Sequence, residues 1–181
     1  MELIIYKSEV LSPAGAIRLA CTDRGACALV LPGVVNPKEK VARSFALARP
    51  GPADHPILRP LIEACSRYFG GEPDAFEGQP VDFSFVTDFQ ARVLEAARTI
   101  PPGMVRSYGW VARKVGNPRS ARAVGGALAA NPVPLIVPCH RVVAANGSLG
   151  GFTGGIAWKR RLLAIEGEIS GHSLKKSQKN P

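Results

Sequence analysis

Apolar and polar residues alternate in short runs along the first third of the chain, which is the pattern of half-buried β-strands. The runs cover residues 2–10, 16–22 and 26–31. Between them lie Ser12-Pro13-Ala14-Gly15 and Asp23-Arg24-Gly25, whose residue types favour turns. The first third is therefore predicted to form a small β-sheet.

Apolar residues take up helical spacing after the predicted strands. From residue 57 to residue 69 they recur three and four positions apart, and Gly70-Gly71 ends the run. Glycine, proline and acidic residues cluster at 77–82, which indicates a boundary between domains. The pattern predicts an N-terminal α/β domain over residues 1–82 and a mostly helical domain over residues 83–168.

Three helices are predicted between residues 88 and 130. Asp88 is expected to cap the first, which ends at residue 100 before a Pro-Pro-Gly sequence. Ser107 is expected to cap the second, which runs to residue 115. The third begins at Pro118, after a tight turn at Gly116, and ends near residue 130. Two short helices joined by such a turn form a helix-turn-helix pattern.

The third predicted helix carries few long polar side chains. Arg119 and Arg122 are followed by alanine, valine, leucine and the pair Gly125-Gly126. A helix that reads the major groove needs several side chains that reach base edges. This helix instead favours close approach to a minor groove, with one arginine inserted. The alternative is that the two glycines allow tight packing between helices.

The charge balance favours a polyanionic partner. The chain has 23 Lys and Arg residues against 14 Asp and Glu residues, which gives a net charge of +9. Such an excess is typical of proteins that neutralise phosphates, although a merely basic soluble protein is the alternative.

The chain shows no membrane or export signal. No run of about 18 uncharged apolar residues is present, and the N-terminus has no signal-peptide pattern, so no membrane partner is expected. The four cysteines are sparse and irregularly spaced, which favours a reducing compartment. A cytoplasmic protein is predicted, or a nuclear one if the source is eukaryotic.

Cys139 is the strongest candidate for chemistry. A lone cysteine is most often a small buried hydrophobe, but His140 and Arg141 follow this one directly. Nearby positive charge and a base increase the thiolate fraction, and the thiolate is the nucleophile. Neighbouring side chains of an extended segment point in opposite directions, so a bridging water is expected between His140 and the thiol.

The sequence Pro138-Cys139-His140-Arg141-Val142 resembles the active-site signature of the O6-alkylguanine-DNA alkyltransferases, also called methylated-DNA–protein-cysteine methyltransferases. Residues 122–127, 131–134, 150–155 and 162–167 resemble the same family in order and spacing. The similarity covers residues 89 to 167 and is weaker in the N-terminal strands. It implies an α/β fold of two small domains, a ribonuclease-H-like N-terminal sheet with a helix and a winged helix-turn-helix-like C-terminal domain.

The resemblance also implies catalytic roles. Cys139 accepts the alkyl group, and His140 takes the thiol proton through water. Glu166 orients that histidine, in the nucleophile–base–orienter arrangement of other thiol enzymes. Tyr108 contacts the flipped guanine and protonates it as it leaves. Asn131 ties the recognition helix to the active-site segment.

Further residues match positions that bind DNA or substrate in the family. Arg122 fills the space that the flipped base leaves in the duplex. Phe152 stands where many relatives have tyrosine, and Thr153 where serine is frequent, which leaves the range of accepted alkyl groups open. The remaining candidates are Asn117, Ser120, Gly125 and Val142.

The implied function is DNA repair by direct reversal of damage. The protein is expected to bind double-stranded DNA through the minor groove as a monomer, to flip out O6-alkylguanine, and to react once per molecule without a cofactor. Some relatives hold zinc in the N-terminal half, near positions that match Cys21 and Cys27. His55 and Cys65 cannot be placed with them, so no metal site is expected. Residues 169–181 are expected to form a basic, mobile tail.

Three other functions remain as alternatives. A non-catalytic lesion binder would share the fold but would not need Cys139. A cysteine hydrolase would use Cys139 and His140, but would leave the helix-turn-helix and Arg122 unexplained. A DNA-binding regulator would need more side chains that read bases than residues 118–130 offer.

Overall fold

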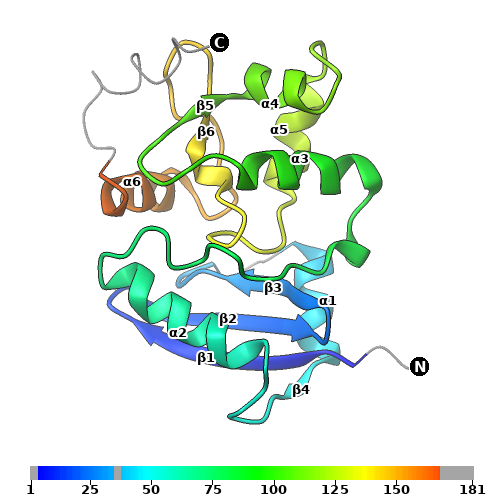
Figure 1. The fold of residues 1–181 in the computed structure, drawn as a ribbon, viewed down its shortest axis with the longest axis vertical. Coiled ribbons are helices and arrows are strands. Elements are labelled where there is room, and N and C mark those ends of the chain that lie inside the picture. The colour runs from blue at the N-terminus through cyan, green and yellow to red at the C-terminus, as the bar shows by residue number, and fades with distance from the viewer. Residues whose placement is uncertain (1–3, 35–37, 168–181) are drawn as a thin grey trace. The chain divides into compact units, whose positions relative to one another are not determined.

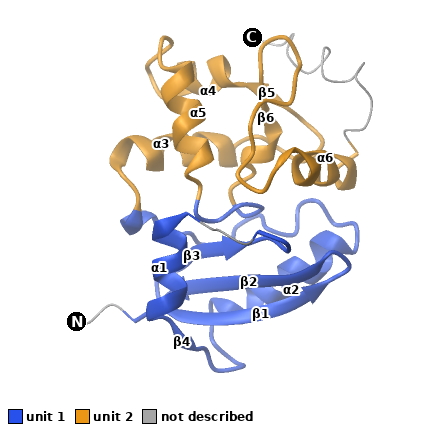
Figure 2. Ribbon diagram, turned by 180° about the vertical axis from the view of Figure 1, so that it is seen from behind, with its two compact units in different colours: residues 1–85, 132–136 blue, residues 86–131, 137–181 orange. Residues whose placement is uncertain are grey.

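The structure is a computed structural model that describes residues 4–34 and 38–167 of the 181-residue chain. It divides into two compact units, which Figure 2 shows in different colours. Unit 1 contains residues 1–85 and 132–136, and unit 2 contains residues 86–131 and 137–181. The short segment 132–136 thus groups with unit 1, although it lies far from residues 1–85 in the sequence. The predicted tail over residues 169–181 lies outside the described residues.

Unit 1 is built on a four-stranded sheet with strand order β3-β2-β1-β4 (Figure 1). The strands are β1 (Tyr6–Ser12), β2 (Gly15–Thr22), β3 (Gly25–Val30) and β4 (Arg49–Pro50). The first three are antiparallel neighbours and confirm the three predicted strands, whereas β4 is a short parallel addition beside β1.

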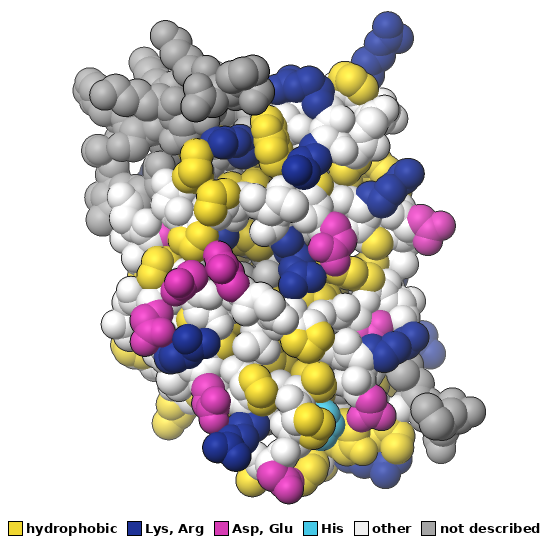
Figure 3. Space-filling view, viewed as in Figure 1, with side chains coloured by type: hydrophobic (Ala, Val, Ile, Leu, Met, Phe, Trp, Pro, Cys, Tyr) yellow, Lys and Arg dark blue, Asp and Glu magenta, His cyan; other side chains and the backbone are white. Residues whose placement is uncertain are grey.

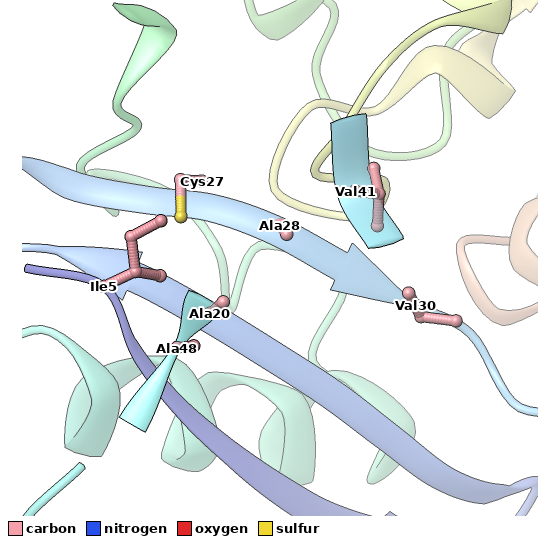
Figure 4. Packing of buried hydrophobic residues seen from close by; sticks show 7 residues of the cluster. All are labelled: Ile5, Ala20, Cys27, Ala28, Val30, Val41 and Ala48. Atoms are coloured by element: carbon pink, nitrogen blue, oxygen red, sulfur yellow. The ribbon is translucent and has the colours of Figure 1, made fainter. Parts of the chain in front are cut away.

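Two helices cover opposite faces of this sheet, as Figures 1 and 2 show from front and back. They are α1 (Glu39–Leu47) and α2 (Leu58–Phe69), of which only α2 was predicted; a 3-10 turn, η1 (Phe83–Phe85), ends the first stretch of the unit. Figure 4 shows the core on the α1 side, formed by Ile5, Ala20, Cys27, Ala28, Val30, Val41 and Ala48. These apolar side chains lose their contact with water on folding, which is the main driving force for unit 1.

Unit 2 is mostly helical. Its helices are α3 (Asp88–Arg98), α4 (Tyr108–Lys114), α5 (Ala121–Ala129) and α6 (Ile156–Ile165). The first three pack against one another, and α4 and α5 with the turn between them form the helix-turn-helix. A sheet in the first unit and a helical second unit agree with the predicted fold class.

The helix ends differ in part from the prediction. Thr87, not Asp88, caps α3, because its side chain accepts a hydrogen bond from the Gln90 backbone in a capping box. Ser107 caps α4 as predicted, accepting from the backbone of Trp110. Helix α5 begins at Ala121, so Pro118 lies in the turn and is not its first helical residue.

No helix within residues 4–34 and 38–167 is long and apolar enough to cross a membrane.

Candidate active site

Two short strands bring the candidate site together in unit 2. β5 (Arg106–Ser107) runs parallel to β6 (Val142–Val143), with Arg106 opposite Val142. Strand β5 leads directly into Tyr108, and β6 directly follows η2 (Cys139–Arg141), a single 3-10 turn. The candidate tyrosine and cysteine are therefore anchored beside the same two-stranded ladder. The segment around Cys139 is a turn and not the extended chain that the sequence suggested.

Cys139 is buried, with 7% of its surface exposed. The side-chain amide of Asn131 donates to its Sγ at 3.1 Å and also to the carbonyl of Val137 at 3.0 Å. Burial raises the pKa of the Cys139 thiol, but the Asn131 hydrogen bond and the charge of Lys159 oppose that rise by stabilising the thiolate. Asn131 follows the end of α5, so it connects that helix to the thiol.

Glu166 joins two residues that follow the thiol. It accepts a hydrogen bond from Nε2 of His140 at 2.8 Å and two from the Arg141 guanidinium, also at 2.8 Å. Burial alone would raise the pKa of Glu166, but these hydrogen bonds and charges lower it to about 2. Arg141 also donates to the carbonyl of Ile100 at 2.6 Å. Glu166 is therefore an ionised carboxylate that fixes both side chains.

The Glu166 contact determines which nitrogen of His140 can act as a base. An ionised carboxylate only accepts hydrogen bonds, so Nε2 of His140 carries the proton. The other nitrogen, Nδ1, is buried and has no partner among the described residues. Burial lowers the pKa of His140; the Glu166 hydrogen bond and charge oppose this, and the charges of Arg141 and Lys159 add to the lowering, so that the pKa is lowered overall. At neutral pH the imidazole is therefore uncharged, with Nδ1 free to accept a proton.

Lys159 places a positive charge beside the thiol. Its side chain is fully buried in α6, and its ammonium donates to the carbonyls of Val142, Leu149 and Gly151, the first at 2.6 Å. Burial lowers the pKa of Lys159 to about 8, while the Cys139 charge favours its protonated form. The same side chain thus stabilises a thiolate and holds the loop at residues 149–151.

Tyr108 lies between helix α5 and that glycine-rich loop. A Cβ built on Gly125 of α5 would lie 3.8 Å from the tyrosine ring, and one on Gly150 only 2.7 Å from its hydroxyl oxygen. Gly150 also has φ +66°, a backbone conformation that favours glycine. Both this conformation and the close approach of Tyr108 therefore require glycine at position 150. Burial and then the Cys139 charge raise the pKa of Tyr108, which keeps its phenol protonated. Its protonated phenol therefore lies within electrostatic range of the thiol.

The loop residues differ in what they contact. Phe152 is partly buried, with its ring perpendicular to that of His140 and the ring centroids 6.5 Å apart. The hydroxyl of Thr153 donates to the carbonyl of Ala129, the last residue of α5, at 2.6 Å. The side chain of Val142 is fully buried in β6, so any contact with substrate would go through its backbone.

The other candidates lie on the helix-turn-helix. Arg122 is exposed in the first turn of α5, and Asn117 is exposed in the turn before it. Ser120 occupies the N-cap position of α5, but its hydroxyl donates to the carbonyl of Asn117 at 2.7 Å. These side chains are on the surface of α5 and its turn, whereas Cys139, Asn131, His140 and Glu166 are buried and form two hydrogen-bonded pairs, Asn131 with Cys139 and His140 with Glu166.

Two residues of the buried site were not among the predicted site residues. Arg141 was considered only as a neighbouring charge, yet it holds Glu166 in place. Lys159 was not considered, although a signal was available: it shares the apolar face of its helix with Leu162 and Leu163. A lysine at such a position must find buried partners for its ammonium.

The cysteines of unit 1 show no metal site. Sγ of Cys21 lies 3.9 Å from Nδ1 of His55, but that nitrogen accepts hydrogen bonds from the backbones of Ile57 and Leu58 at the start of α2. Nδ1 of His55 is therefore occupied by the backbone where α2 begins. Within the described part of the chain, no three His, Cys, Asp or Glu side chains are grouped so that they could hold a metal ion.

Comparisons with known proteins agree on one family. A model of the DNA-binding domain of 6-O-methylguanine DNA methyltransferase matches residues 88–168. The methylated-DNA–protein-cysteine methyltransferase of Mycolicibacterium paratuberculosis is 38% identical over 173 residues, which are 95% of this chain and 98% of that protein. The protein of the same name from Methanosarcina acetivorans is 45% identical over 163 residues, covering 90% and 99% of the two chains.

Solved structures lead to the same result. The crystal structure of Mycobacterium tuberculosis OGT in complex with DNA matches with a TM-score of 0.74 and 34% identity, over 94% of this chain and 99% of that one. The named relatives belong to a class of methyltransferases whose acceptor is a protein cysteine. The chain belongs to the methylated-DNA–protein-cysteine methyltransferase family.

Proposed function

We propose that this protein repairs alkylated DNA by moving an alkyl group, chiefly methyl, from O6 of guanine in duplex DNA to Sγ of Cys139. The observation that carries the proposal is the buried network around this thiol. A hydrogen-bond donor, a buried ammonium and a neutral histidine with one unprotonated nitrogen all lie close to Cys139. Each of them favours formation of the thiolate.

The chemical step is a displacement at carbon. Nδ1 of His140 takes the thiol proton through a bridging water, and Glu166 stabilises the imidazolium that forms. Sγ then bonds to the alkyl carbon while the bond from that carbon to O6 breaks. The phenol of Tyr108 protonates the guanine as it leaves, and the proton held by His140 restores the phenol. The products are guanine in DNA and an S-alkylcysteine.

Access to this thiol requires base flipping. Cys139 is buried in unit 2 and cannot attack O6 in line while the guanine remains stacked. Helix α5 presents alanine and glycine over most of its length, which suits close approach to a minor groove. The exposed Arg122 then fills the space that the guanine leaves and offsets part of the cost of unstacking.

The reaction takes place once per molecule, because a thioether has no ready leaving route. We infer that the protein acts as a monomer without a cofactor. The direct test is incubation with a duplex that carries labelled O6-methylguanine. One methyl group on Cys139, by intact mass and peptide mapping, is the expected result. A second turnover, or hydrolysis of DNA or peptide substrates, would refute the proposal.

The role of Arg122 needs a separate test. Arg122→Ala should slow transfer from methylated duplex at saturating DNA, whereas Arg119→Ala, which removes an exposed charge from the adjacent turn, should be normal there. A phosphate contact affects only encounter and affinity, and saturation removes that defect. A wild-type rate for Arg122→Ala at saturation would show that it anchors the protein electrostatically and does not support flipping.

A further inference from the structure

Positive charge is concentrated in one long part of unit 2. Between Glu95 and Glu166 the chain has ten Lys and Arg residues and no Asp or Glu residue. Arg98 pairs with Glu95, and Arg141 and Lys159 are buried with internal partners. The other seven are exposed or partly exposed, namely Arg106, Arg113, Lys114, Arg119, Arg122, Arg160 and Arg161. Figure 3 shows Lys and Arg side chains among the surface groups of one face of the molecule.

Two of these cations converge on one tryptophan. Trp110 and Lys114 are four residues apart in α4 and therefore lie on the same side of the helix, and Arg106, in strand β5 just before it, reaches the same ring. The guanidinium carbon of Arg106 lies 5.7 Å from the centre of the Trp110 ring, and Nζ of Lys114 lies 5.3 Å from it. Trp110 is partly exposed, while the core side of α4 carries other residues, the buried Val111 and Ala112. The three side chains therefore form a continuous strip on the outside of the helix.

The arrangement brings two cations to one ring. Two like charges near one ring repel each other, and Lys114 forms no ion pair with an acidic side chain in the part of the chain that the structure describes. Cation–π attraction to Trp110 offsets part of this repulsion and limits the motion of both side chains. Long cationic side chains that are already held in place lose less entropy when they bind a phosphate.

We propose that Arg106, Trp110 and Lys114 form a binding site for backbone phosphates of duplex DNA, separate from the recognition helix α5. This inference rests on the proposed function, since it assumes that DNA is the partner. The first helix of a helix-turn-helix crosses the DNA backbone, and the strip lies on that helix. Arg106 directly precedes Ser107 and Tyr108, so a phosphate held there would fix the backbone near the reacting base. An arginine fork can bind phosphate oxygens in a bidentate way.

The test is the salt dependence of binding to an unmethylated duplex, which cannot react. Fluorescence anisotropy gives the affinity of wild type, Arg106→Gln and Lys114→Gln from about 50 to 200 mM salt. Each lost phosphate contact should make the slope of log K against log salt less steep by about 0.9. When the salt concentration rises over that range, the fold loss of affinity should be about threefold smaller for each variant than for wild type. Arg49→Gln, which removes an exposed charge from unit 1, is the matched control and should keep the wild-type slope.

Trp110→Leu tests the part played by the ring. This variant keeps both charges, so the salt slope should stay near the wild-type value while the affinity falls several-fold. In the double variant with Lys114→Gln, the fold loss of affinity should be smaller than the product of the two single losses. Unfolding midpoints show whether the variants are folded. Wild-type slopes for both charge variants, or an equal loss of slope in Arg49→Gln, would overturn the site while leaving the proposed function intact. If the wild-type protein bound no duplex, the proposed function itself would be refuted.

Discussion

The two units of the molecule treat buried cysteines differently. In unit 1, the pKa of Cys21, Cys27 and Cys65 is raised to about 12, mainly by burial, and nearby acidic groups contribute to the rise at the first two. In unit 2, Cys139 is equally removed from water, but Asn131 and Lys159 stabilise its thiolate. Burial raises the pKa of all four thiols, but Cys139 alone among them has an amide donor and an ammonium that favour its thiolate, as a nucleophilic cysteine requires.

The two units also differ in net charge. Unit 2 holds 14 of the 23 Lys and Arg residues but only 4 of the 14 Asp and Glu residues. The basic excess that the whole sequence shows is thus a property of unit 2, and unit 1 is close to neutral. Attraction to DNA and the reactive thiol are combined in one unit, which the family model also matches.

The largest expected effect separates the four cysteines. Cys139→Ser should abolish methyl transfer completely, because a serine hydroxyl is not ionised under these conditions, while DNA binding should remain. Cys65→Ser removes a thiol from the core of unit 1 and should still accept one methyl group per chain. Intact-mass measurement after excess methylated DNA distinguishes the two. Methyl transfer to Cys139→Ser, or label on Cys21, Cys27 or Cys65, would refute the claim that the acceptor thiol lies in unit 2 alone.

The second effect concerns the stability of the charged network in unit 2. Glu166→Gln leaves Arg141 buried without a carboxylate and should lower the free energy of unfolding by about 3–5 kcal/mol. The matched change in unit 1, Glu63→Gln, breaks an exposed ion pair with Arg59 and should cost less than about 1 kcal/mol. Denaturant titration measures both. Equal losses would show that the Glu166 network contributes no more than a surface pair.

The same carboxylate predicts a dependence on pH. The pKa of Glu166 is about 2 in the folded protein, below its ordinary value of 4.5. The folded state therefore binds this proton less readily than the unfolded state, so the contribution is complete above about pH 4.5 and is lost as the pH falls towards 2. Wild type should lose stability over that range more steeply than Glu166→Gln. Parallel curves for the two proteins would contradict the lowered pKa.

Much of the fold could be predicted from local patterns. The three strands, α2 and the cap at Ser107 each follow from periodicity or from one capping residue. Helix α1 was missed because its buried side chains are Val41 and Ser44, so a polar residue interrupts the apolar face. The capping box at Thr87 was available in the sequence, but the acidic residue next to it was chosen instead.

The site could be predicted only in part. The signature around Cys139 identified the thiol and its neighbours, since they are adjacent in the sequence. The pairing of Arg106 with Val142 could not be predicted, because strands of two residues leave no periodic pattern. The hydrogen bonds of Lys159 to loop carbonyls depend on a loop whose course the sequence does not specify.

The third effect compares the histidines of the two units. His140→Gln should slow transfer about 100-fold at neutral pH, because glutamine cannot take the thiol proton. The defect should shrink as the pH rises and solvent deprotonates the thiol. His55→Gln changes a side chain that accepts backbone hydrogen bonds where α2 begins in unit 1, and should leave the rate normal. Single-turnover rates between about pH 6 and 9 test this, because that range spans the ordinary cysteine pKa of about 8.5. A normal rate in His140→Gln would show that the proton relay is wrongly assigned.

The smallest effect concerns the hydrogen bond that joins the glycine-rich loop to the end of α5 in unit 2. The Thr153 hydroxyl donates to the carbonyl of Ala129, and Asn131, two residues further on, donates to Sγ of Cys139. The end of α5 is thus fixed both to the loop and to the thiol. Thr153→Val keeps the shape but loses the hydroxyl, and an exposed hydrogen bond of about 1 kcal/mol corresponds to roughly fivefold slower transfer. Thr153→Ser keeps the hydroxyl and should restore the rate. If valine were normal and serine slow, the methyl group would be the important part of Thr153, and the loop would not depend on its bond to α5.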